Sequence, residues 1–302
     1  MLKKTRQAHG VKAFNLINIL LLVSFSILVI FPFYNCIVLS FNNGMDAMRG
    51  SIYFWPRQFT MENYSQVLAQ PIFTKAAINS IARTLITTVL AIICTAAYAF
   101  VLTHKKLALR KLYLTLGLIT MYFSGGLIPT YLLIRDLNLI DSFWVYVFPG
   151  LFSMFNAVLF MSFFDGISPS LEESAKIDGA NEVRILFQII LPVSKPVIAA
   201  VGLFIAVGQW NSWFDTMLYT TNDSLETLSY MFKKMIETMQ YLEMQIAQVG
   251  GENVQNMIKS QEVTTITLQM AAMVITSFPI IALYPALQKY FIQGMMIGSV
   301  KG

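Results

Sequence analysis

The chain has 302 residues, of which 56% are hydrophobic and only 12% are charged, and its mean hydropathy is +0.61. A soluble domain carries about 25% charged residues, so this composition excludes the soluble classes of protein. The net charge of +5 is typical of a membrane protein with basic flanks, and it requires no nucleic-acid partner.

Long uncharged runs predict the fold. A helix needs roughly 20 mostly apolar residues to cross about 30 Å of hydrocarbon. The runs that meet this requirement are Ala13–Met45, Thr84–Thr103, Leu112–Ile134, Ser142–Phe164, Pro196–Phe214 and Val263–Gln288. We therefore predict an all-α membrane protein with six transmembrane helices, in which residues 13–302 form a single polytopic domain after a short cytoplasmic tail, residues 1–12.

The distribution of lysine and arginine predicts the orientation, because cytoplasmic flanks of spans are enriched in positive charge. The segments Lys3–Lys12 and His104–Lys111 are basic, whereas the turn Arg135–Asp141 is balanced. Both termini are therefore expected in the cytoplasm. No cleavage pattern of a signal peptide follows the first apolar run, so we expect this run to be a retained span.

The cysteines and histidines give no sign of a metal site. Cys36 and Cys94 lie in apolar runs near opposite faces of the membrane, and we interpret them as packing residues. His9 and His104 lie in basic segments, and neither has a Cys, Asp or Glu at ligand spacing. We predict neither a metal nor a cofactor bound by this chain.

Two polar segments are expected outside the membrane. The first, 42–74, contains Tyr53-Phe54-Trp55-Pro56, which is typical of an interfacial aromatic belt but would also suit contact with a docking partner. In the second, 215–262, apolar residues recur at helical spacing from Leu225 to Ile246, and Gly250-Gly251 follows as a stop. This pattern predicts an external amphipathic helix that either packs on the spans or offers a methionine-rich surface to a delivery protein.

The cytoplasmic segment between the predicted fourth and fifth spans, residues 168–195, is the most informative. Ser170 and Glu173 form a capping box that predicts the start of a helix. Gly179 can adopt a positive φ and interrupt this helix, and Asn181 can cap a second helix that begins at Glu182. We therefore predict a helix, a sharp turn and a second helix at the membrane surface. This geometry by itself fits a purely structural role as well as a functional one.

The string Leu171-Glu172-Glu173-Ser174-Ala175-Lys176-Ile177-Asp178-Gly179-Ala180, followed by Ile189, Leu191 and Pro192, resembles the EAA loop of bacterial ABC importer permeases. That signature reads E-A-A, three residues, G, nine residues, I, one residue and L-P. The positions that match it are Glu173, Ser174, Ala175, Gly179, Ile189, Leu191 and Pro192. Serine replaces the first alanine, which is the one departure from the pattern.

Other residues resemble the carbohydrate-uptake branch of this family, and within it the permeases that serve complex oligosaccharides. The resemblance covers roughly residues 10 to 302 and includes Trp55-Pro56, Asn79-Ser80, Gly125–Tyr131 and Gln209–Trp213.

The resemblance implies a subunit of a larger transporter in the bacterial cytoplasmic membrane. A second homologous permease, a different chain, would pair with it in a heterodimer. Two ATPase subunits would bind beneath and use ATP and Mg, and an extracellular or periplasmic solute-binding protein would deliver the ligand. The residues implied in ATPase coupling are Glu172, Glu173, Ser174, Ala175, Asp178, Gly179 and Ala180.

A transport path for sugars needs aromatic faces together with amides or carboxylates. That combination occurs at the outer end of the predicted fifth span, in Gln209, Trp210, Asn211, Trp213 and Asp215. Lesser candidates are Tyr122, Tyr131 and Gln269. Aromatic residues at the end of a span are also ordinary interfacial anchors, so the two interpretations stand side by side.

The polar and ionisable residues of the chain also bear on three other function classes. A permease for amino acids or peptides could use similar polar groups. An ion-coupled secondary transporter would carry ionisable residues inside its spans, whereas the six runs contain none and Arg83 and Asp165 stand at their margins. A membrane enzyme would need a convergent acid, base or metal set, which the sequence does not offer. The sequence also has no phosphate-binding G-x-x-x-x-G-K loop, so another subunit must hydrolyse ATP.

Overall fold

The computed structural model of the protein describes residues 2–249 and 263–299. All the regular elements in these two ranges are helical, and one isolated antiparallel bridge joins Asn42 to Phe59. The predicted all-α class is therefore confirmed. The chain forms two compact units, with Met1–Gln70 and Met235–Thr276 in unit 1 and Pro71–Lys234 and Ser277–Gly302 in unit 2.

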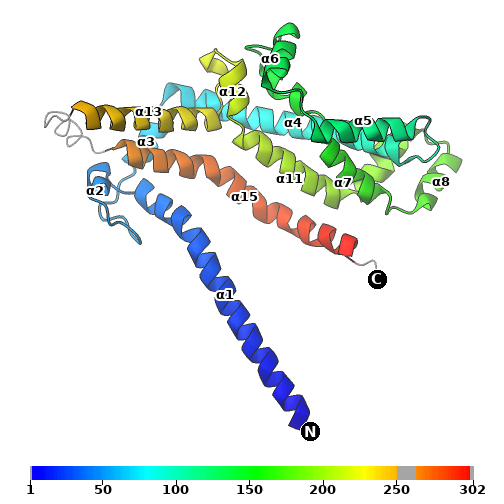
Figure 1. Ribbon diagram of the computed structural model, residues 1–302, viewed down its shortest axis with the longest axis horizontal. Helices are drawn as coiled ribbons and strands as arrows, with labels where there is room; N and C mark the ends of the chain where they lie inside the picture. The colour runs from blue at the N-terminus through cyan, green and yellow to red at the C-terminus, as the bar shows by residue number, and fades with distance from the viewer. Residues whose placement is uncertain (1, 250–262, 300–302) are drawn as a thin grey trace. The chain divides into compact units, whose positions relative to one another are not determined.

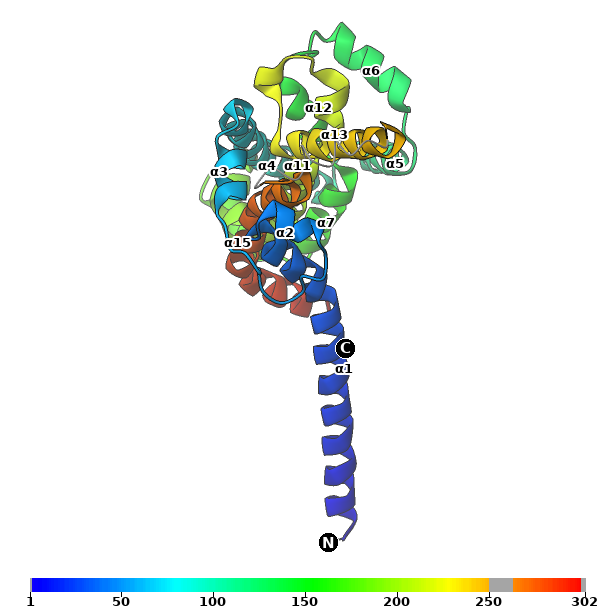
Figure 2. The same ribbon diagram turned by 90° about the vertical axis from the view of Figure 1, so that its left-hand side faces the viewer.

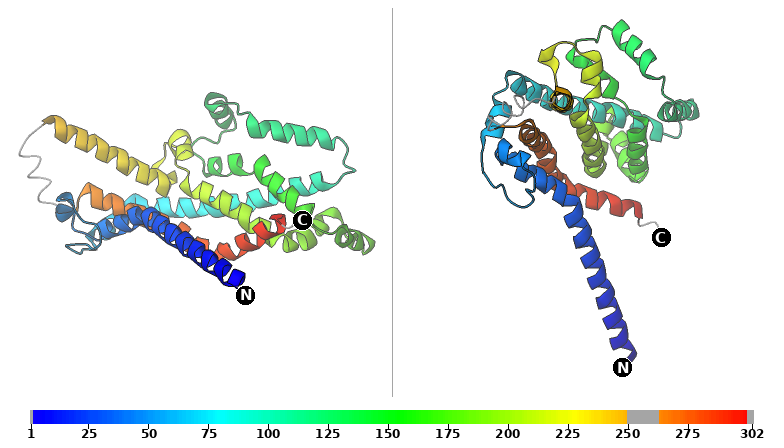
Figure 3. Two further views of the ribbon diagram at one scale, coloured as in Figure 1. Left: turned by 60° about the horizontal axis from the view of Figure 1, so that its bottom comes forward. Right: turned by 60° about the vertical axis from the view of Figure 1, so that its left-hand side comes forward.

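Unit 1 is dominated by one long helix, which is drawn in blue in both views of Figure 3. Its elements, with the parts of two helices that continue into unit 2, are α1 (Leu2–Ser40), α2 (Gly44–Met48), α3 (Glu62–Leu68), α13 (Leu228–Val249) and α15 (Thr265–Ser299). The apolar side chains of α1 from Phe14 to Phe33 are exposed, as expected of a helix that faces lipid.

The chain folds back along the C-terminal end of α1. The hydroxyl of Tyr34 donates to the carbonyl of Phe54 (2.6 Å), and the amide of Asn35 donates to the carbonyl of Ile52 (2.8 Å). Trp55 remains 78% exposed beside them. The aromatic segment singled out in the sequence thus lies against the C-terminal end of α1, an arrangement that suits an interfacial belt.

Unit 2 contains the remaining helices. They are α4 (Pro71–Thr103), α5 (Arg110–Tyr122), α6 (Leu127–Asp136), η1 (Phe143–Tyr146), η2 (Phe148–Gly150), α7 (Met154–Phe164), α8 (Pro169–Ile177), α9 (Glu182–Ile185), η3 (Leu186–Ile190), α10 (Leu191–Val193), α11 (Lys195–Asn211), α12 (Phe214–Tyr219) and η4 (Asp223–Leu225). In Figure 1, α4, α7 and α11 run together, and α8 lies at the end of this group where α5 begins.

The core of unit 2 joins the spans to the loop between the predicted fourth and fifth spans. Phe100 of α4, Phe160 of α7 and Val201 of α11 are buried in one apolar cluster. Ala175 of α8 and Ile185 of α9 belong to the same cluster. The loop is therefore seated on the ends of the spans by apolar packing as well as by the chain connections.

Three helices are long and apolar enough to cross a membrane without a break, and they are Phe14–Ser40, Pro71–Thr103 and Thr265–Ala282. The third and fourth runs, each predicted as one span, are divided into two helices in the structure. The third run bends by 114° between α5 and α6, where Gly126 has a φ of +88° that glycine adopts without a steric cost. The fourth bends by 48° after η2, where Pro149 lacks a backbone N–H and Ser153 is extended.

The second predicted run is too short. Helix α4 begins at Pro71 rather than at Thr84, so Lys75 and Arg83 lie within it. Arg83 is therefore not at the margin of the span as the charge pattern suggested. A charged residue inside such a helix needs a partner, which the structure supplies.

The amphipathic helix predicted after the fifth span exists as α13. Its first turn is capped from another helix, because the hydroxyl of Ser80 on α4 accepts a hydrogen bond from the backbone N–H of Leu228 (2.8 Å). The amide of Asn79 donates to the carbonyls of Ser224 and Glu226. The predicted stop at Gly250-Gly251 lies outside the described residues. The cysteines are free thiols, and Cys94 is exposed on α4 rather than packed inside this chain.

Candidate functional site

The loop between α7 and α11 begins with α8, and its start differs from the prediction. The N-cap of α8 is Ser168, and Pro169 occupies the first helical turn. The hydroxyl of Ser170 interacts with that of Ser168 (2.8 Å), so the expected capping box of Ser170 and Glu173 is not formed. Proline fixes the φ needed at the first helical position and lacks an N–H that would have no partner there, which explains the earlier start.

The turn after α8 has the form expected from its glycine. Gly179 has a φ of +79°. The N–H of Gly179 donates to the carbonyl of Lys176 (3.1 Å), and the N–H of Ala180 donates to that of Ala175 (2.9 Å). These two bonds form a Schellman motif, which ends a helix at a left-handed residue. The C-cap of α8 is Asp178, which is exposed like Ser174 and Glu173.

The second short helix is capped as predicted. The side chain of Asn181 accepts a hydrogen bond from the backbone N–H of Arg184 (2.8 Å). Ala180 packs against the core cluster of unit 2 beside Ala175. The loop thus consists of two capped helices joined by a hydrogen-bonded turn, and Ala175, Ala180 and Ile185 are among the residues that attach it to the spans.

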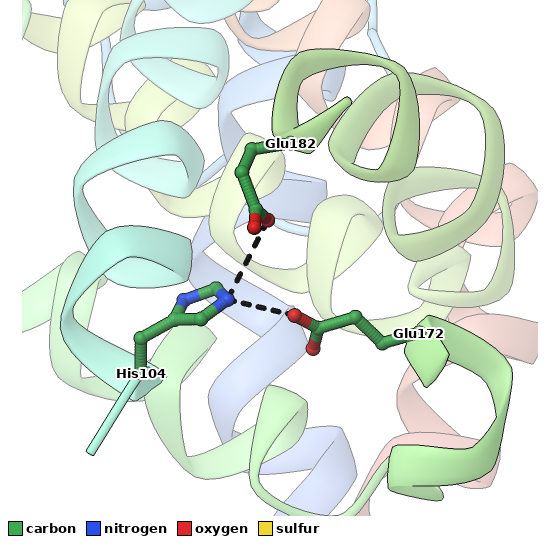
Figure 4. A group of neighbouring side chains, drawn as sticks. All are labelled: His104, Glu172 and Glu182. Carbon is green, nitrogen blue, oxygen red and sulfur yellow. Dashed lines mark hydrogen bonds and ion pairs between the residues drawn. The ribbon is translucent and has the colours of Figure 1, made fainter. Parts of the chain in front are cut away.

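An ionic cluster that the sequence did not predict ties the loop to α4 (Figure 4). The Nε2 atom of His104, directly after α4, lies 2.7 Å from Oε1 of Glu172 and 3.6 Å from Oε2 of Glu182. The Nζ atom of Lys176 lies 2.7 Å from Oε1 of Glu172 and 2.9 Å from Oε1 of Glu182. We call these four residues the loop cluster.

The charges within the loop cluster stabilise one another. Burial of Glu172 opposes its ionisation, but hydrogen bonds from Lys176 and His104 outweigh burial and lower the pKa of this carboxyl below its ordinary value. Hydrogen bonds to Glu172 and Glu182 raise the pKa of Lys176. Two carboxylates therefore face two basic side chains across the turn at Gly179.

The loop cluster contains ligand types that metal ions use. The ligand atoms of His104, Glu172 and Glu182 lie within 4.8 Å of one another. However, the ammonium group of Lys176 already forms ion pairs with both carboxylates. The arrangement therefore fits an ion-pair network better than a metal site.

The loop also exposes apolar side chains on both sides of its turn. Ile177 is 87% exposed and Val183 is 65% exposed. Burial of such side chains against a partner is favourable by about 25 cal/mol per Å². These two side chains are therefore available for contact with a partner.

A second cluster surrounds Arg83, whose side chain is only 1% exposed. Its guanidinium group forms an ion pair with Asp215 of α12 and donates to the side-chain oxygen of Gln209 on α11 (2.9 Å). It also donates to the carbonyl of Ser212 (3.3 Å) and lies over the ring of Tyr146, 4.4 Å from its centroid. The buried charge within α4 is thus paired.

The predicted path residues fall into separate groups. Gln209 and Asp215 meet at Arg83, and Trp210 is buried on the same helix as Gln209. Asn211 is exposed, and Trp213 lies under the ammonium group of Lys233 at 4.5 Å.

The lesser candidates do not join this group in the structure. Tyr131 on α6 stacks on Tyr219 of α12, with 6.0 Å between ring centroids, in the region where Figure 2 shows these two helices. Tyr122 is 76% exposed at the end of α5. Gln269 belongs to unit 1, whereas the other candidates belong to unit 2.

The sequence analysis did not predict the roles of two residues that hold these sites together, His104 and Arg83. His104 was read as part of a basic segment because its carboxylate partners are 68 or more residues away in the chain. Arg83 was read as marginal because its partners on α11 and α12 are 126 and 132 residues away. The signal that could have identified Arg83 is helical continuity, since no glycine or proline separates Pro71 from Thr84.

Taken together, the apolar helices and the capped loop between α7 and α11 are those of a membrane permease subunit. The chain belongs to the family described as binding-protein-dependent transport system inner membrane component, whose model matches residues 76–297. The family consists of transport subunits, so the chain is not an enzyme.

The chain is similar over nearly its whole length to proteins of Bacillus subtilis (strain 168). Protein LplC is 37% identical over 97% of this chain and 98% of its own length. The polygalacturonan/rhamnogalacturonan transport system permease protein YtcP is 31% identical over 93% of this chain and 96% of its own.

The fold is similar to that of a solved transporter. A chain in the crystal structure of a bacterial ABC transporter involved in the import of the acidic polysaccharide alginate has a TM-score of 0.81 and 27% identity. The match covers 93% of this chain and 97% of that one.

Proposed function

We propose that the chain is the permease subunit of an ATP-driven ABC importer that takes up oligosaccharides across the bacterial cytoplasmic membrane. In this proposal each bent helix pair is one span, so the chain crosses the membrane six times and both termini are cytoplasmic. Relatives named for polygalacturonan and alginate transport support a saccharide as the substrate.

The apolar surface of the loop is the observation that carries the coupling to ATP hydrolysis. Ile177 and Val183 stand exposed on either side of a turn that is fixed by hydrogen bonds. We assign this surface, with Glu173 beside it, to a cleft of an ATPase subunit. A capped and packed loop can transmit a displacement, whereas a loop without such contacts would absorb it.

The complete transporter contains further subunits. A second, different permease pairs with this chain, two ATPase subunits use ATP and Mg, and an external solute-binding protein delivers the saccharide. Within this chain the path is assigned to the outer end of α11 and the segment that follows it. The residues assigned to it are Gln209, Trp210, Asn211, Trp213 and Asp215.

Reconstitution in vesicles tests the proposal. We expect uptake of a labelled oligosaccharide that requires ATP, the ATPase subunits and the binding protein. Uptake that an ion gradient drives without the ATPases would overturn the coupling, and uptake of peptides or amino acids in place of saccharides would overturn the substrate class.

Two variants test the assigned surface. Ile177→Asp and Glu173→Lys should remain in the membrane, fail to copurify with the ATPase subunits and lose ATP-driven uptake. The control is Met48→Asp, which places the same charge at an exposed apolar position on α2 and should leave both properties unchanged. Normal copurification and uptake in the two loop variants would contradict the assignment.

A further inference from the structure

The ring of His104 is held at both nitrogens. Its Nδ1 atom lies 2.9 Å from the carbonyl oxygen of Phe100, and its Nε2 atom lies 2.7 Å from Oε1 of Glu172. A carbonyl oxygen and an ionised carboxylate only accept hydrogen bonds. Both ring nitrogens must therefore carry hydrogen for both bonds to form, and the ring is then a cation.

The charged groups near this ring come from several elements. Glu172 and Lys176 lie on α8, and Glu182 begins α9. Arg110 begins α5 and donates to the carbonyl of Leu102 at the end of α4 (2.6 Å). With His104 protonated, the four residues of the loop cluster sum to zero charge, and α4 is tied to the helices on both sides of the turn at Gly179.

The part of α4 around Arg83 is also held to neighbouring helices by charged and polar contacts. Arg83 joins α4 to Gln209 of α11 and Asp215 of α12. Arg83 and His104 are 21 positions apart, which corresponds to about 32 Å along a helix. Helix α4 is continuous between them. One rigid helix therefore has an ionic attachment to the cytoplasmic loop near one end and another to the assigned path segment.

We propose that His104 is a positioning residue for transport. It acts as a charged latch through which a displacement of the loop moves α4 and, through Arg83, the segment from Gln209 to Asp215. This inference rests on the proposed function, because it assigns a role within ATP-driven uptake.

The amount of oligosaccharide taken up per ATP hydrolysed is the measurement that tests the latch. His104→Ala should lower this ratio about tenfold, since a hydrogen bond to a charged group is lost, while ATP hydrolysis by the complex stays within about twofold. Lys106→Ala, an exposed basic residue two positions away, is the matched control and should leave the ratio unchanged. If His104→Ala fails to assemble, His104→Gln, which can donate to Glu172 but carries no charge, should show the same loss.

Rescue by a variant that keeps the charge separates the latch from a general structural role. His104→Arg keeps a positive charge and N–H donors at this position, so it should restore most of the ratio that His104→Ala loses.

Three outcomes would overturn the inference, and they are distinguishable. An unchanged ratio in both His104→Ala and His104→Gln, with wild-type uptake driven by ATP, overturns the latch and leaves the proposed function intact. Wild-type uptake that a zinc-selective chelator abolishes and Zn²⁺ restores replaces the latch with a metal site. The absence of any ATP-driven uptake by the wild-type complex overturns the proposed function and the latch together.

Discussion

The pairing of Arg83 with Asp215 makes a prediction about stability that can be measured on the purified protein. Arg83 is 1% exposed and the side chain of Asp215 is 23% exposed, so each charge is largely removed from water. Removing one partner of such a pair costs about 3–5 kcal/mol, because the other charge stays buried without compensation. We take about 3 kcal/mol for Arg83→Met, since the partial exposure of Asp215 lets water reach it.

A double-mutant cycle tests this reasoning in detergent. Arg83→Met and Asp215→Leu should each lower the free energy of unfolding by about 3 kcal/mol, whereas the double variant should lose much less than the sum, because no unpaired charge remains. The assay is thermal or denaturant unfolding followed by intrinsic fluorescence. Lys75→Met, an exposed position on the same helix, is the control and should change stability by less than about 0.5 kcal/mol. Additive losses in the double variant would refute the claim that the two charges stabilise each other.

Three further predictions concern the turn, the path and the loop at Asp141. Gly179→Pro should stop ATP-driven uptake with the protein still in the membrane, because proline cannot adopt the φ of +79° or donate the N–H that bonds to Lys176; normal uptake would contradict this. Asn211→Ala should leave the unfolding free energy within about 0.5 kcal/mol, since the residue is exposed, yet lower oligosaccharide uptake; equal uptake and equal substrate preference would remove Asn211 from the path. Hydrogen bonds from Thr221 and Asn222 lower the pKa of Asp141, so this carboxylate should stabilise the fold above its unfolded pKa of about 3.9 and cease to do so as the pH falls through its lower folded value. Asp141→Ala should therefore show a smaller loss of melting temperature on acidification than the wild type, and an identical acid dependence would count against it.

Local patterns in the sequence predicted the local structure well. The positive φ at Gly179, the cap at Asn181 and the helix α13 follow from neighbouring residues, and each appears in the structure. These features depend on backbone sterics and on hydrogen bonds within a few positions, which a sequence displays directly. The start of α8 was missed by the same logic, because Pro169 at the first helical position outweighed the capping box at Ser170.

The breaks within the apolar runs show where hydropathy fails as a guide. An uncharged run indicates that a segment is apolar, but it does not indicate whether the helix within it is straight or bent. The 114° bend at Gly126 lies in a run that hydropathy alone reads as one span. Glycine pairs and proline are the local signals of such breaks, and Gly125-Gly126 and Pro149 were present in the sequence.

Long-range pairing was beyond any local pattern, and it changes the argument about function. The charge count inside the predicted spans argued against an ion-coupled transporter, but Arg83 lies inside α4 and is paired. A paired and buried arginine is already neutralised by Asp215, so it offers no free site for a coupling ion. The exclusion of ion coupling therefore rests on the family and on this pairing rather than on an absence of charge.

The placement of both ionic clusters on α4 follows from what a membrane helix can transmit. An apolar interface between helices in lipid gives little directional restraint, because lipid tails and leucine side chains are equally apolar. A charge pair restrains both distance and direction, and it is strongest where water is scarce. Arg83 and His104 are thus suited to fix the direction of α4 relative to its neighbours, and the apolar residues between them pack against α7 and α11. A helix built in this way moves as one body, which is what a link between an ATPase surface and a transport path requires.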